Sequence, residues 1–526
     1  MLKKVPGGEI LYSIARTILE AESFASTGGT GPTAFGSNKK ASDIISRAIK
    51  NNGIALIQGP PGTGKTTTYM DVIERTIFGI PANEVYLYIA PTNELVYDMF
   101  RKVCFYYATK LGSTFGKYLV NEVRVYGSQF DFTGYETLNN QLASGVKIVI
   151  STNYQRIFNS DGKIIYHMLV DEASKSPLHV PFQILVNQIL KEKQLDGSIS
   201  IVGDPMQAIS LSEYYSGLRR RLLMMSYFIR GKLDIPSYDI SDDYQLLLRA
   251  RKEINDGTYG FLDTTFRIPG PSHKAISQGY YNGELLAHSR FSERIRSEHF
   301  DMNALRNLKN ESIEFKLVGQ TIEDALTTDV GMMIILDDNK HPYRSVEGVL
   351  FDESRGEYGL VAAIILAIIT KQKTTVVTTY VDQHFQMRMK YFRKYHSLAT
   401  KYIKDVDNLL SFKTTQSMLG AQSFNSVLVL GKESSGSVGE RTIYFQEPEL
   451  LNVQLSRHLG FLVVVGNLKR LYHSASAMDT TSGTKNYKSL GVTAEVILNQ
   501  AGYEKKNRNF SKSVSGNECE SLEIQS

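Results

Sequence analysis

A nine-residue glycine-rich stretch, GPPGTGKTT at 59–67, constrains the fold of this chain more than any other feature. The apolar run IALIQ (54–58) precedes it and TYMDVIERTI (68–77) follows it, which predicts a buried strand, a tight loop and a helix. Glycines let backbone N–H groups gather around phosphate oxygens, and the helix adds the positive end of its dipole. The stretch therefore predicts a phosphate-binding loop in an α/β sheet.

Each residue of this loop has an expected task, because the stretch fits the pattern G-x-x-x-x-G-K-T. Lys65 would contact the β- and γ-phosphates, and the Thr66 hydroxyl would bind Mg²⁺. The expected cofactors are therefore ATP and Mg²⁺. The residues expected to contact the nucleotide here are Gly59, Pro60, Pro61, Gly62, Thr63, Gly64, Lys65, Thr66 and Thr67.

Short apolar runs alternate with helical patterns along the chain, which is typical of parallel sheets with crossover helices. The predicted strands fall into two groups, the first at 54–58, 85–90, 146–151, 167–172 and 199–204, and the second at 374–380, 426–431 and 461–466. We therefore predict an α/β protein with two parallel-sheet domains. The predicted segments are an N-terminal linker (1–37), a first domain (38–262) with an insertion at about 211–261, a second domain (263–475) and a C-terminal extension (476–526) with a disordered end.

Composition excludes several classes of protein. Two cysteines in 526 residues cannot form a disulfide framework or a zinc site, which favours a reducing intracellular setting, cytoplasmic or nuclear and not secreted. The most apolar run, GLVAAIILAIIT (359–370), is too short to span a bilayer, so we predict a buried helix and no membrane association. A net charge of +5 permits a nucleic-acid partner without requiring one.

Polar residues follow two of the predicted strands of the first domain. LVDEAS (169–174) places Asp171 and Glu172 at the mouth of the sheet, where Asp171 is suited to hold the metal and Glu172 to deprotonate the attacking water. SIVGDPMQ (200–207) ends at Gln207, whose amide could sense the γ-phosphate or its water. An Asp-Glu pair or a glutamine alone is usually part of a solvated turn. The phosphate loop earlier in the chain is the reason to assign a function to Asp171-Glu172 and to Gln207.

Two arginines lie beyond the first predicted sheet, Arg267 in FLDTTFRIP and Arg457 in NVQLSRHLG. Guanidinium groups can stabilise charge on a transferring phosphoryl group. If both reach the nucleotide, ATP would close the two domains and hydrolysis would release them. This arrangement indicates a motor rather than a kinase.

These motifs together resemble those of superfamily 1 helicases, and within them the Upf1-like group and the nidovirus helicases. The resemblance covers about residues 38 to 475 and depends on the order of the motifs. The ordered set is GPPGTGKTT, APTNELV (90–96), ISTN (150–153), VDEAS, GDPMQ, LDTTFRIP, TTYVDQ (378–383), TTQSMLGAQ (414–422) and NVQLSRHLG.

The resemblance implies two RecA-like domains with a nucleotide cleft between them and single-stranded DNA or RNA bound across both. It implies an ATP-dependent helicase that moves 5′ to 3′, with replication, repair or RNA-processing proteins as possible partners. Phe266 matches the residue that stacks on adenine, and Gly420 and Gln422 match nucleotide-contacting positions. The positions that match the path of the strand are Pro91, Thr92, Asn93, Thr152 and Ser417.

The sequence departs from the pattern of the group at several positions. Ala41 and Ser42 lie where the group has an adenine-reading glutamine, and Lys175 lies where it has a glutamine after the acidic pair. Two readings besides a helicase stay open. One is a nucleotide-dependent clamp that remodels nucleoprotein complexes without unwinding, and the other is a different P-loop enzyme, such as a kinase or an AAA+ ring subunit.

Two basic stretches that contain aromatic residues, GLRRRLLMMSYFIRGK (217–232) and MRMKYFRKYH (387–396), remain outside these motifs. Such interleaving suits a surface that grips a nucleic-acid strand, where stacking adds to phosphate contacts. The commoner alternative is an amphipathic helix with a solvated basic face.

Overall fold

The chain forms two compact units, Met1–Phe266 and Arg267–Ser526, which we describe separately. The computed structural model describes residues 36–112, 121–127, 130–131, 145–153, 164–176, 197–207, 224–236, 243–288, 300–326, 333–336, 344–346, 349–418, 421–433, 443–481 and 487–500. The predicted linker up to residue 35 and the predicted disordered end lie outside these residues, as do residues 208–223, which include the first part of the basic stretch at 217–232.

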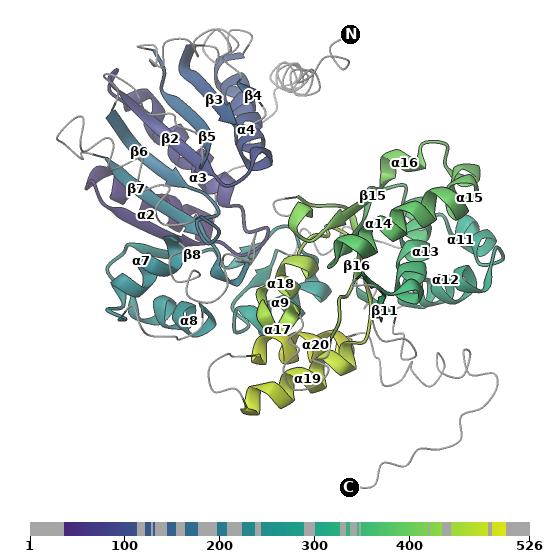
Figure 1. The fold of residues 1–526 in the computed structure, drawn as a ribbon. Helices are drawn as coiled ribbons and strands as arrows, with labels where there is room; N and C mark the ends of the chain where they lie inside the picture. Colours follow the sequence, from purple (N-terminus) through teal and green to yellow (C-terminus); the bar gives the residue numbers. More distant parts are fainter. Residues whose placement is uncertain are drawn as a thin grey trace. The chain divides into compact units, whose positions relative to one another are not determined.

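The first unit is built around an eight-stranded sheet in the order β4-β3-β5-β2-β6-β7-β1-β8 (Figure 1). All neighbouring strands run parallel except β4, which is antiparallel to β3. The strands are β1 (Ile54–Gln58), β2 (Glu84–Ala90), β3 (Val123–Gly127), β4 (Phe130–Asp131), β5 (Ile148–Thr152), β6 (Ile164–Val170), β7 (Ser198–Gly203) and β8 (Tyr259–Phe261), and the short β9 (Thr264–Thr265) follows. The central strands are buried on both faces, which explains their continuous apolar sequences.

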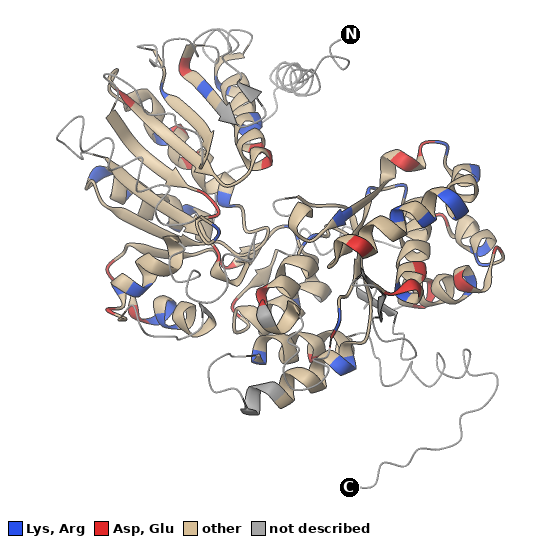
Figure 2. Ribbon diagram, viewed as in Figure 1, with Lys and Arg blue, Asp and Glu red and all other residues tan. Residues whose placement is uncertain are grey.

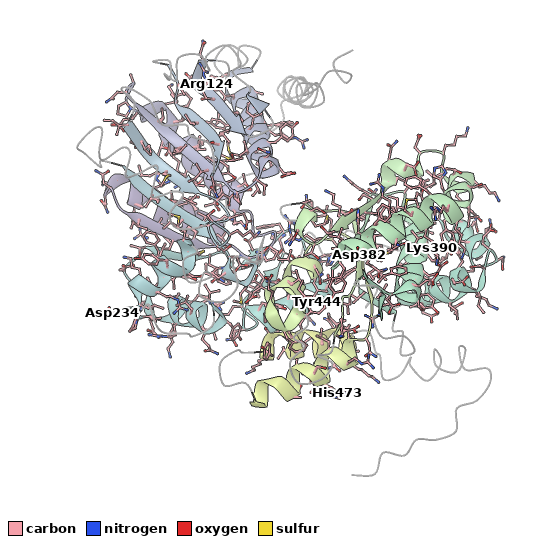
Figure 3. All side chains as sticks on the ribbon, viewed as in Figure 1. Arg124, Asp234, Asp382, Lys390, Tyr444 and His473 are labelled. Carbon is pink, nitrogen blue, oxygen red and sulfur yellow. The ribbon has the colours of Figure 1, made fainter. Side chains whose placement is uncertain are left out.

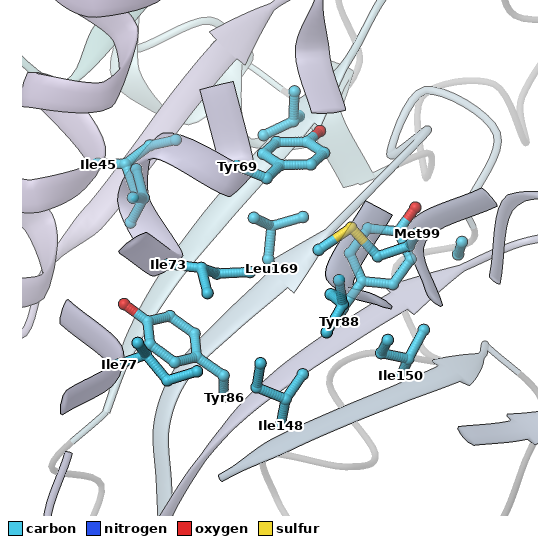
Figure 4. Close-up of a cluster of buried hydrophobic side chains, with 14 of the residues drawn as sticks. Ile45, Tyr69, Ile73, Ile77, Tyr86, Tyr88, Met99, Ile148, Ile150 and Leu169 are labelled. Carbon is cyan, nitrogen blue, oxygen red and sulfur yellow. The ribbon is translucent and has the colours of Figure 1, made fainter. Parts of the chain in front are cut away.

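Helices supply one wall of this unit's main core. The helices are α2 (Ser37–Lys50), α3 (Lys65–Thr76), α4 (Asn93–Leu111), α7 (Met224–Lys232) and α8 (Asp243–Glu253), with short 3₁₀ turns η2 (Ile77–Gly79) and η4 (Pro205–Gln207). Side chains of α2, α3 and α4 pack against those of β2, β5 and β6, as Figure 4 shows for Tyr69, Met99 and Leu169. This packing fixes the start of α3, and therefore the phosphate loop, against the sheet.

The second unit contains a five-stranded, wholly parallel sheet in the order β11-β17-β16-β14-β15. The strands of this unit are β10 (Leu286–Ala287), β11 (Met333–Leu336), β12 (Arg344–Val346), β13 (Val349–Phe351), β14 (Thr374–Thr378), β15 (Leu410–Thr414), β16 (Asn425–Val429) and β17 (Leu462–Val465). β12 and β13 form a separate antiparallel hairpin.

Helix α13 (Glu353–Thr370) is the centre of the second unit's core. It is apolar almost all round, because it is buried among α11 (Met302–Leu308), α12 (Ile313–Leu326), α14 (Val381–Lys390) and the sheet. Asp352 caps its start by accepting a hydrogen bond from the backbone N–H of Arg355 at 3.0 Å. The other helices of this unit are α9 (Gly270–Tyr280), α11 (Met302–Leu308), α12 (Ile313–Leu326), α14 (Val381–Lys390), α15 (His396–Tyr402), α16 (Val406–Leu409), α17 (Ile443–Gln446), α18 (Glu449–Leu455), α19 (Leu468–Thr481) and α20 (Lys488–Gln500), together with the π-helical turn η8 (Tyr391–Tyr395) and the 3₁₀ turn η9 (Gln416–Met418).

The predicted fold class, α/β with two parallel-sheet units, is confirmed. All eight predicted strands are present within two or three residues of their expected bounds, and the run at 359–370 forms a buried helix as predicted. No described helix is both long and apolar enough to cross a membrane. Among the strands of the two parallel sheets, β3, β4, β8, β11 and β15 were not predicted, and neither were the short strands β9, β10, β12 and β13.

Candidate active site

The phosphate loop joins β1 to α3 and has the backbone conformation that its glycines predict. Gly62 and Gly64 have φ angles of 71° and 81°, in the left-handed region that residues with a side chain rarely adopt. Gly59 is required for a different reason, because a Cβ atom there would lie 2.5 Å from Cγ of Lys65. The Lys65 side chain therefore folds back over the loop, and its Nζ donates to the Gly59 carbonyl at 3.1 Å.

Asn38 on α2 braces this loop from outside the motif. Its side chain is 2% exposed, and its amide nitrogen donates to the Thr63 carbonyl at 2.8 Å and to the Thr68 hydroxyl at 3.0 Å. Ser42, at a position where the resemblance expects an adenine-reading glutamine, donates instead to the Thr68 carbonyl at 3.3 Å and is buried. The structure thus uses Asn38 and Ser42 to hold the loop and α3.

Three adjacent strands bring the candidate residues of the first unit to one edge of the sheet. β6, β7 and β1 are neighbours, and Asp171, Asp204 and the phosphate loop follow their carboxyl ends. In parallel sheets this edge is the usual place for a ligand site. The sequence motifs are therefore brought together by the topology of the sheet.

Two tyrosines hold the carboxylate of Asp171, which is 3% exposed. The Tyr69 hydroxyl, from α3, donates to Oδ1 at 3.0 Å, and the Tyr88 hydroxyl, from β2, donates to Oδ2 at 2.6 Å. Burial and the negative charge of Asp171 raise the pKa of both tyrosines well above the usual value, so both remain donors at neutral pH. These two residues were not predicted from the sequence.

Glu172 is the centre of an ionic cluster beside Asp171. Its Oε1 lies 3.1 Å from Nζ of Lys65, and its Oε2 lies 2.9 Å from Nζ of Lys175. Burial alone would raise the pKa of Glu172, but the ammonium groups of Lys175 and Lys65 outweigh it and hold the pKa well below its usual range. The backbone of Glu172 is strained, with φ at 48°.

The oxygen ligands near Lys65 fit a magnesium ion that keeps much of its coordinated water. Asp171 supplies a carboxylate, and the Thr66 hydroxyl at the start of α3 forms no hydrogen bond with a described residue. The carboxylate also accepts the backbone N–H of Glu172 at Oδ1, 2.8 Å away. A carboxylate has about four acceptor positions, so these three donors leave about one lone pair, on Oδ2, for metal-bound water. Oxygen ligands of this kind are those that Mg²⁺ prefers.

Gln207 lies on η4, after β7, in a buried polar network. Its amide nitrogen donates to Oδ2 of Asp204 at 2.8 Å, and Oδ1 of Asp204 accepts from the Gln58 amide at 3.3 Å. Gln58 in turn accepts from the Tyr259 hydroxyl of β8 at 2.8 Å. The network ties the candidate γ-phosphate sensor to the strand that leads into the phosphate loop.

The segment after β8 lies against the phosphate loop. The backbone N–H of Phe266 donates to the Gly62 carbonyl at 2.8 Å, and the Thr265 hydroxyl donates to the Pro61 carbonyl at 2.9 Å. Phe266, the candidate stacking residue, is therefore anchored to the loop through its main chain. The first unit also includes these residues up to Phe266.

Arg267 and Arg457 belong to the second unit, where their surroundings differ. Nε of Arg267 donates to Oε1 of Gln422 at 3.0 Å. Arg457 is 2% exposed, and its guanidinium donates to the Val453 carbonyl at 2.7 Å and to the Ser456 hydroxyl at 3.0 Å. Gly420, the other candidate of this segment, lies outside the described residues.

His458 links the surroundings of the two arginines. It is buried and lies 2.6 Å (Nε2) from the Ser272 hydroxyl of α9. Burial, aided by the positive charge of Arg267, lowers the pKa of His458 to about 3, so the imidazole is neutral. The backbone N–H of Ser423, next to Gln422, also donates to the Arg457 carbonyl at 2.9 Å, so the Arg267–Gln422 pair and Arg457 lie in one neighbourhood of the second unit.

The candidate strand-contacting residues also follow the carboxyl ends of strands. Pro91, Thr92 and Asn93 follow β2, and Thr152 ends β5, whose register pairs it with Ala90. Thr92 caps α4 by accepting from the Leu95 N–H at 3.4 Å, and Thr152 is 6% exposed. Ser417 lies in the second unit, on the exposed turn η9, and donates to the Thr414 carbonyl at 3.0 Å.

No curated protein sequence matches the chain. Among solved structures, that of S. cerevisiae Dbp5 bound to RNA and ADP BeF3 is 10% identical, with a TM-score of 0.41, and the match covers 92% of this chain and 97% of that one. The structure of the DUF1998 helicase MrfA bound to DNA is 11% identical, with a TM-score of 0.41, and covers 82% of this chain and 48% of that one. By sequence, residues 36–153 match the AAA_11 family, described as an AAA domain.

Proposed function

We propose that this protein is an ATP-dependent superfamily 1 helicase or translocase, which moves on single-stranded DNA or RNA and separates duplexes by cycles of ATP hydrolysis. The observation that carries the proposal is the pairing of Lys65 with Glu172 at 3.1 Å, beside the buried carboxylate of Asp171. A phosphate-binding lysine, a base and a metal-holding carboxylate are the parts that hydrolysis of a triphosphate needs. The AAA domain match at 36–153 and the ordered motifs support the same proposal.

In this proposal the residues of the first unit exchange partners when the nucleotide binds. Lys65 leaves the Gly59 carbonyl and Glu172 for the β- and γ-phosphates, which frees one oxygen of Glu172 to accept the proton of the attacking water. Thr66 and Asp171 would hold Mg²⁺, which when bound offsets negative charge on the phosphate oxygens. Gln207 would orient the water.

The second unit would supply the groups that couple hydrolysis to movement. Arg267 and Arg457 would stabilise charge developing on the γ-phosphate, as arginine fingers do. Arg457 first has to leave the Val453 carbonyl, to which it donates at 2.7 Å. Pro91, Thr92, Asn93, Thr152 and Ser417 would contact the strand, with 5′ to 3′ movement as in the group that the motifs resemble.

An ATPase assay with and without single-stranded DNA or RNA tests the proposal. We expect polynucleotide to stimulate hydrolysis, and stimulation to fall as salt rises because phosphate contacts release counterions. Duplexes with a 5′ or a 3′ overhang then report unwinding and its direction. Lys65→Ala is the control and should be inactive on every substrate. Hydrolysis indifferent to any polynucleotide would contradict the proposal.

Arg457→Ala tests the proposed role of the second unit. The variant should lower kcat more than it lowers nucleotide affinity, because the guanidinium acts on charge that develops only in the transition state. Single-turnover hydrolysis and nucleotide titration separate the two quantities. Hydrolysis at the wild-type rate would remove Arg457 from the reaction.

One observation favours a second candidate, a strand-stimulated ATPase that clamps or remodels nucleoprotein without unwinding. Lys175 pairs with Glu172 at 2.9 Å and is only 5% exposed, so the base is kept weak even after Lys65 departs. Slow hydrolysis suits a clamp better than a motor. Polynucleotide-stimulated hydrolysis without unwinding on either overhang would select this candidate.

A further inference from the structure

A long helical segment of the second unit turns an unusual face to solvent. α14 (Val381–Lys390) continues through η8 (Tyr391–Tyr395) into α15 (His396–Tyr402). Asp382 and Lys390, near the two ends of α14, are labelled in Figure 3. The inward side chains recur every fourth residue and are buried in the unit's core, namely Gln383, Met387, Tyr391 and Tyr395.

Three large apolar side chains of this segment point outward, among polar and charged ones. Val381 is 69% exposed, Phe385 is 57% exposed and Phe392 is 50% exposed. With the exposed Arg388 they follow the helical spacing i, i+4, i+7, i+11, so they form one stripe about 16 Å long. A surface helix normally places polar residues on this face. We call Val381, Phe385, Arg388, Phe392 and the adjacent Arg393 the α14 outer face.

The charged residues of the outer face have no partner of opposite charge. The side chains of Arg388 and Arg393 form no ion pair or hydrogen bond with any described residue, whereas Lys390 and Lys394 both pair with Glu357. From Val381 to His396 the sequence has four basic residues and one acidic residue, Asp382, and Figure 2 shows this excess around α14 and α15. The outer face therefore combines uncompensated positive charge with exposed rings.

The backbone under the outer face is also unusual. Residues 391–395 form a π-helical turn, and such turns are rare and occur frequently at functional sites. The turn keeps Tyr391 and Tyr395 in the core while Phe392 stays outside. The Phe392 ring has two ring contacts within its own segment, with centroids 5.1 Å from the Tyr391 ring and 5.8 Å from the His396 ring.

The outer face begins at the edge of the sheet that carries a candidate strand contact. β14 ends at Thr378, shortly before α14, and its parallel neighbour β15 ends at Thr414, shortly before Ser417. Because parallel neighbours end at the same edge, the start of α14 and the turn with Ser417 lie at one side of this unit. A ligand at Ser417 could continue along α14.

We propose that the α14 outer face binds single-stranded nucleic acid, with bases stacked on Phe385 and Phe392 and phosphates held by Arg388 and Arg393. The proposal rests on the proposed function and adds a second contact surface to it. Stacking on exposed rings and pairing with free arginines are the two contacts that bind single strands without regard to sequence. A protein partner would have to place carboxylates opposite both guanidinium groups, whereas a nucleic-acid strand carries a phosphate at every nucleotide.

The absence of tryptophan from the chain allows a direct test. Phe392→Trp introduces one tryptophan on the outer face, which can be excited selectively over the tyrosines, and base stacking should quench its emission when a single-stranded oligonucleotide is added. Phe78→Trp in the first unit is the matched control, because Phe78 is 69% exposed and lies outside the outer face. We expect saturable quenching in the first variant and little change in the second.

The same titrations separate failure of this inference from failure of the proposed function. Binding is followed independently through the anisotropy of a labelled oligonucleotide. If wild-type protein does not bind it at all, the proposed function fails. If it binds and Phe392→Trp is not quenched, or is quenched no more than Phe78→Trp, the outer face is not a binding surface. An emission change that depends on protein concentration alone would point to a second copy and also overturn the inference.

Alanine and glutamine variants measure the two kinds of contact. Phe392→Ala should weaken oligonucleotide binding about 10-fold, since stacking of one base is lost. Arg388→Gln should reduce the slope of log K against log salt by about 1, as expected for one phosphate contact. Both should leave hydrolysis without polynucleotide unchanged. Wild-type affinity and salt slope in both variants would contradict the inference.

Discussion

The two units each bury an ionic cluster at the carboxyl edge of a parallel sheet, and the clusters differ in what surrounds the carboxylates. In the first unit Glu172 lies between two ammonium groups, Lys65 and Lys175. In the second unit one guanidinium, Arg355, lies 2.8 Å from Glu433 and 3.4 Å from Asp352, and also donates to the Gly431 carbonyl at 3.3 Å.

The pKa values of the two glutamates shift in opposite directions as a result. Burial raises the pKa of Glu433, and the single nearby Arg355 does not fully offset it. The two lysines more than offset the burial of Glu172. The backbone also fixes Glu433, because its Oε1 accepts the Asn467 N–H at 2.6 Å. The comparison indicates a structural cluster in the second unit and an exchangeable one in the first.

The largest effect that sharpens this comparison is on catalysis. Glu172→Gln should lower kcat for ATP hydrolysis by about 100- to 10,000-fold, because it removes the proposed general base, while nucleotide binding is retained. Hydrolysis assays and a fluorescent-nucleotide titration measure the two effects. Lys65→Ala should instead lower both kcat and the affinity for nucleotide. A Glu172→Gln protein with near-wild-type turnover would place the base elsewhere.

The next effect tests the cluster of the second unit. Arg355→Met should lower the free energy of unfolding by about 3–5 kcal/mol, because it leaves two buried carboxylates without a cation. Arg249→Met is the control, since its pair with Glu253 is exposed to solvent and its loss should have little effect on stability. Denaturant unfolding followed by circular dichroism measures both. Equal losses in the two variants would show that the buried cluster is not structural.

A smaller effect on stability compares two tyrosines of β2, one bonded to a charged group and the other to a neutral group. Tyr88→Phe should cost about 1.5–3 kcal/mol of unfolding free energy, because the buried Asp171 carboxylate loses a donor at 2.6 Å. Tyr86→Phe, two residues earlier on β2, removes a contact with the neutral Thr76 hydroxyl and should cost less, about 0.5–1.5 kcal/mol. The reverse order would mean that Asp171 does not need the tyrosine.

The smallest effect is a pH dependence carried by a buried histidine. Burial lowers the pKa of His167 to about 3, and its Nδ1 lies 2.7 Å from the Ser198 hydroxyl. Below pH of about 6.5 the unfolded chain binds a proton that the folded chain does not, so stability falls as pH falls toward 3. One such histidine costs about 1.4 kcal/mol per pH unit in this window. Unfolding midpoints at pH 7 and 5.5 should differ less in His167→Gln than in the wild type.

The sequence was sufficient for the strands that carry long apolar runs and for the motifs that follow them. Lys65, Asp171 and Glu172 were predicted because their residue types and positions after strands have one common chemical use. The structure adds Tyr69 and Tyr88, whose hydrogen bonds to Asp171 span 102 and 83 residues. A tyrosine in an apolar pattern gives no sign of such a partner.

Other parts of the site escaped prediction because their signals are short or ambiguous. β8 has only three residues, and the Tyr259 that it contributes reaches Gln58 across 201 residues of sequence. Asn38 precedes the phosphate loop in a region where the motif pattern directs attention to other positions, although it donates to Thr63. For Arg267 and Arg457 the motifs predict a role but not their partners. In the structure Arg267 donates to the side-chain amide oxygen of Gln422, and Arg457 donates to the backbone carbonyl of Val453.

The left-handed backbone at Glu172 has a consequence for how this position can vary. With φ at 48°, backbone strain at this position is lowest for glycine, asparagine or aspartate and highest for valine, isoleucine or threonine. A library randomised at this codon and sorted for soluble expression would therefore enrich the small, turn-forming residues. The same library sorted for ATP turnover would return glutamate alone. Selection for folding and selection for catalysis therefore favour different residues at this position.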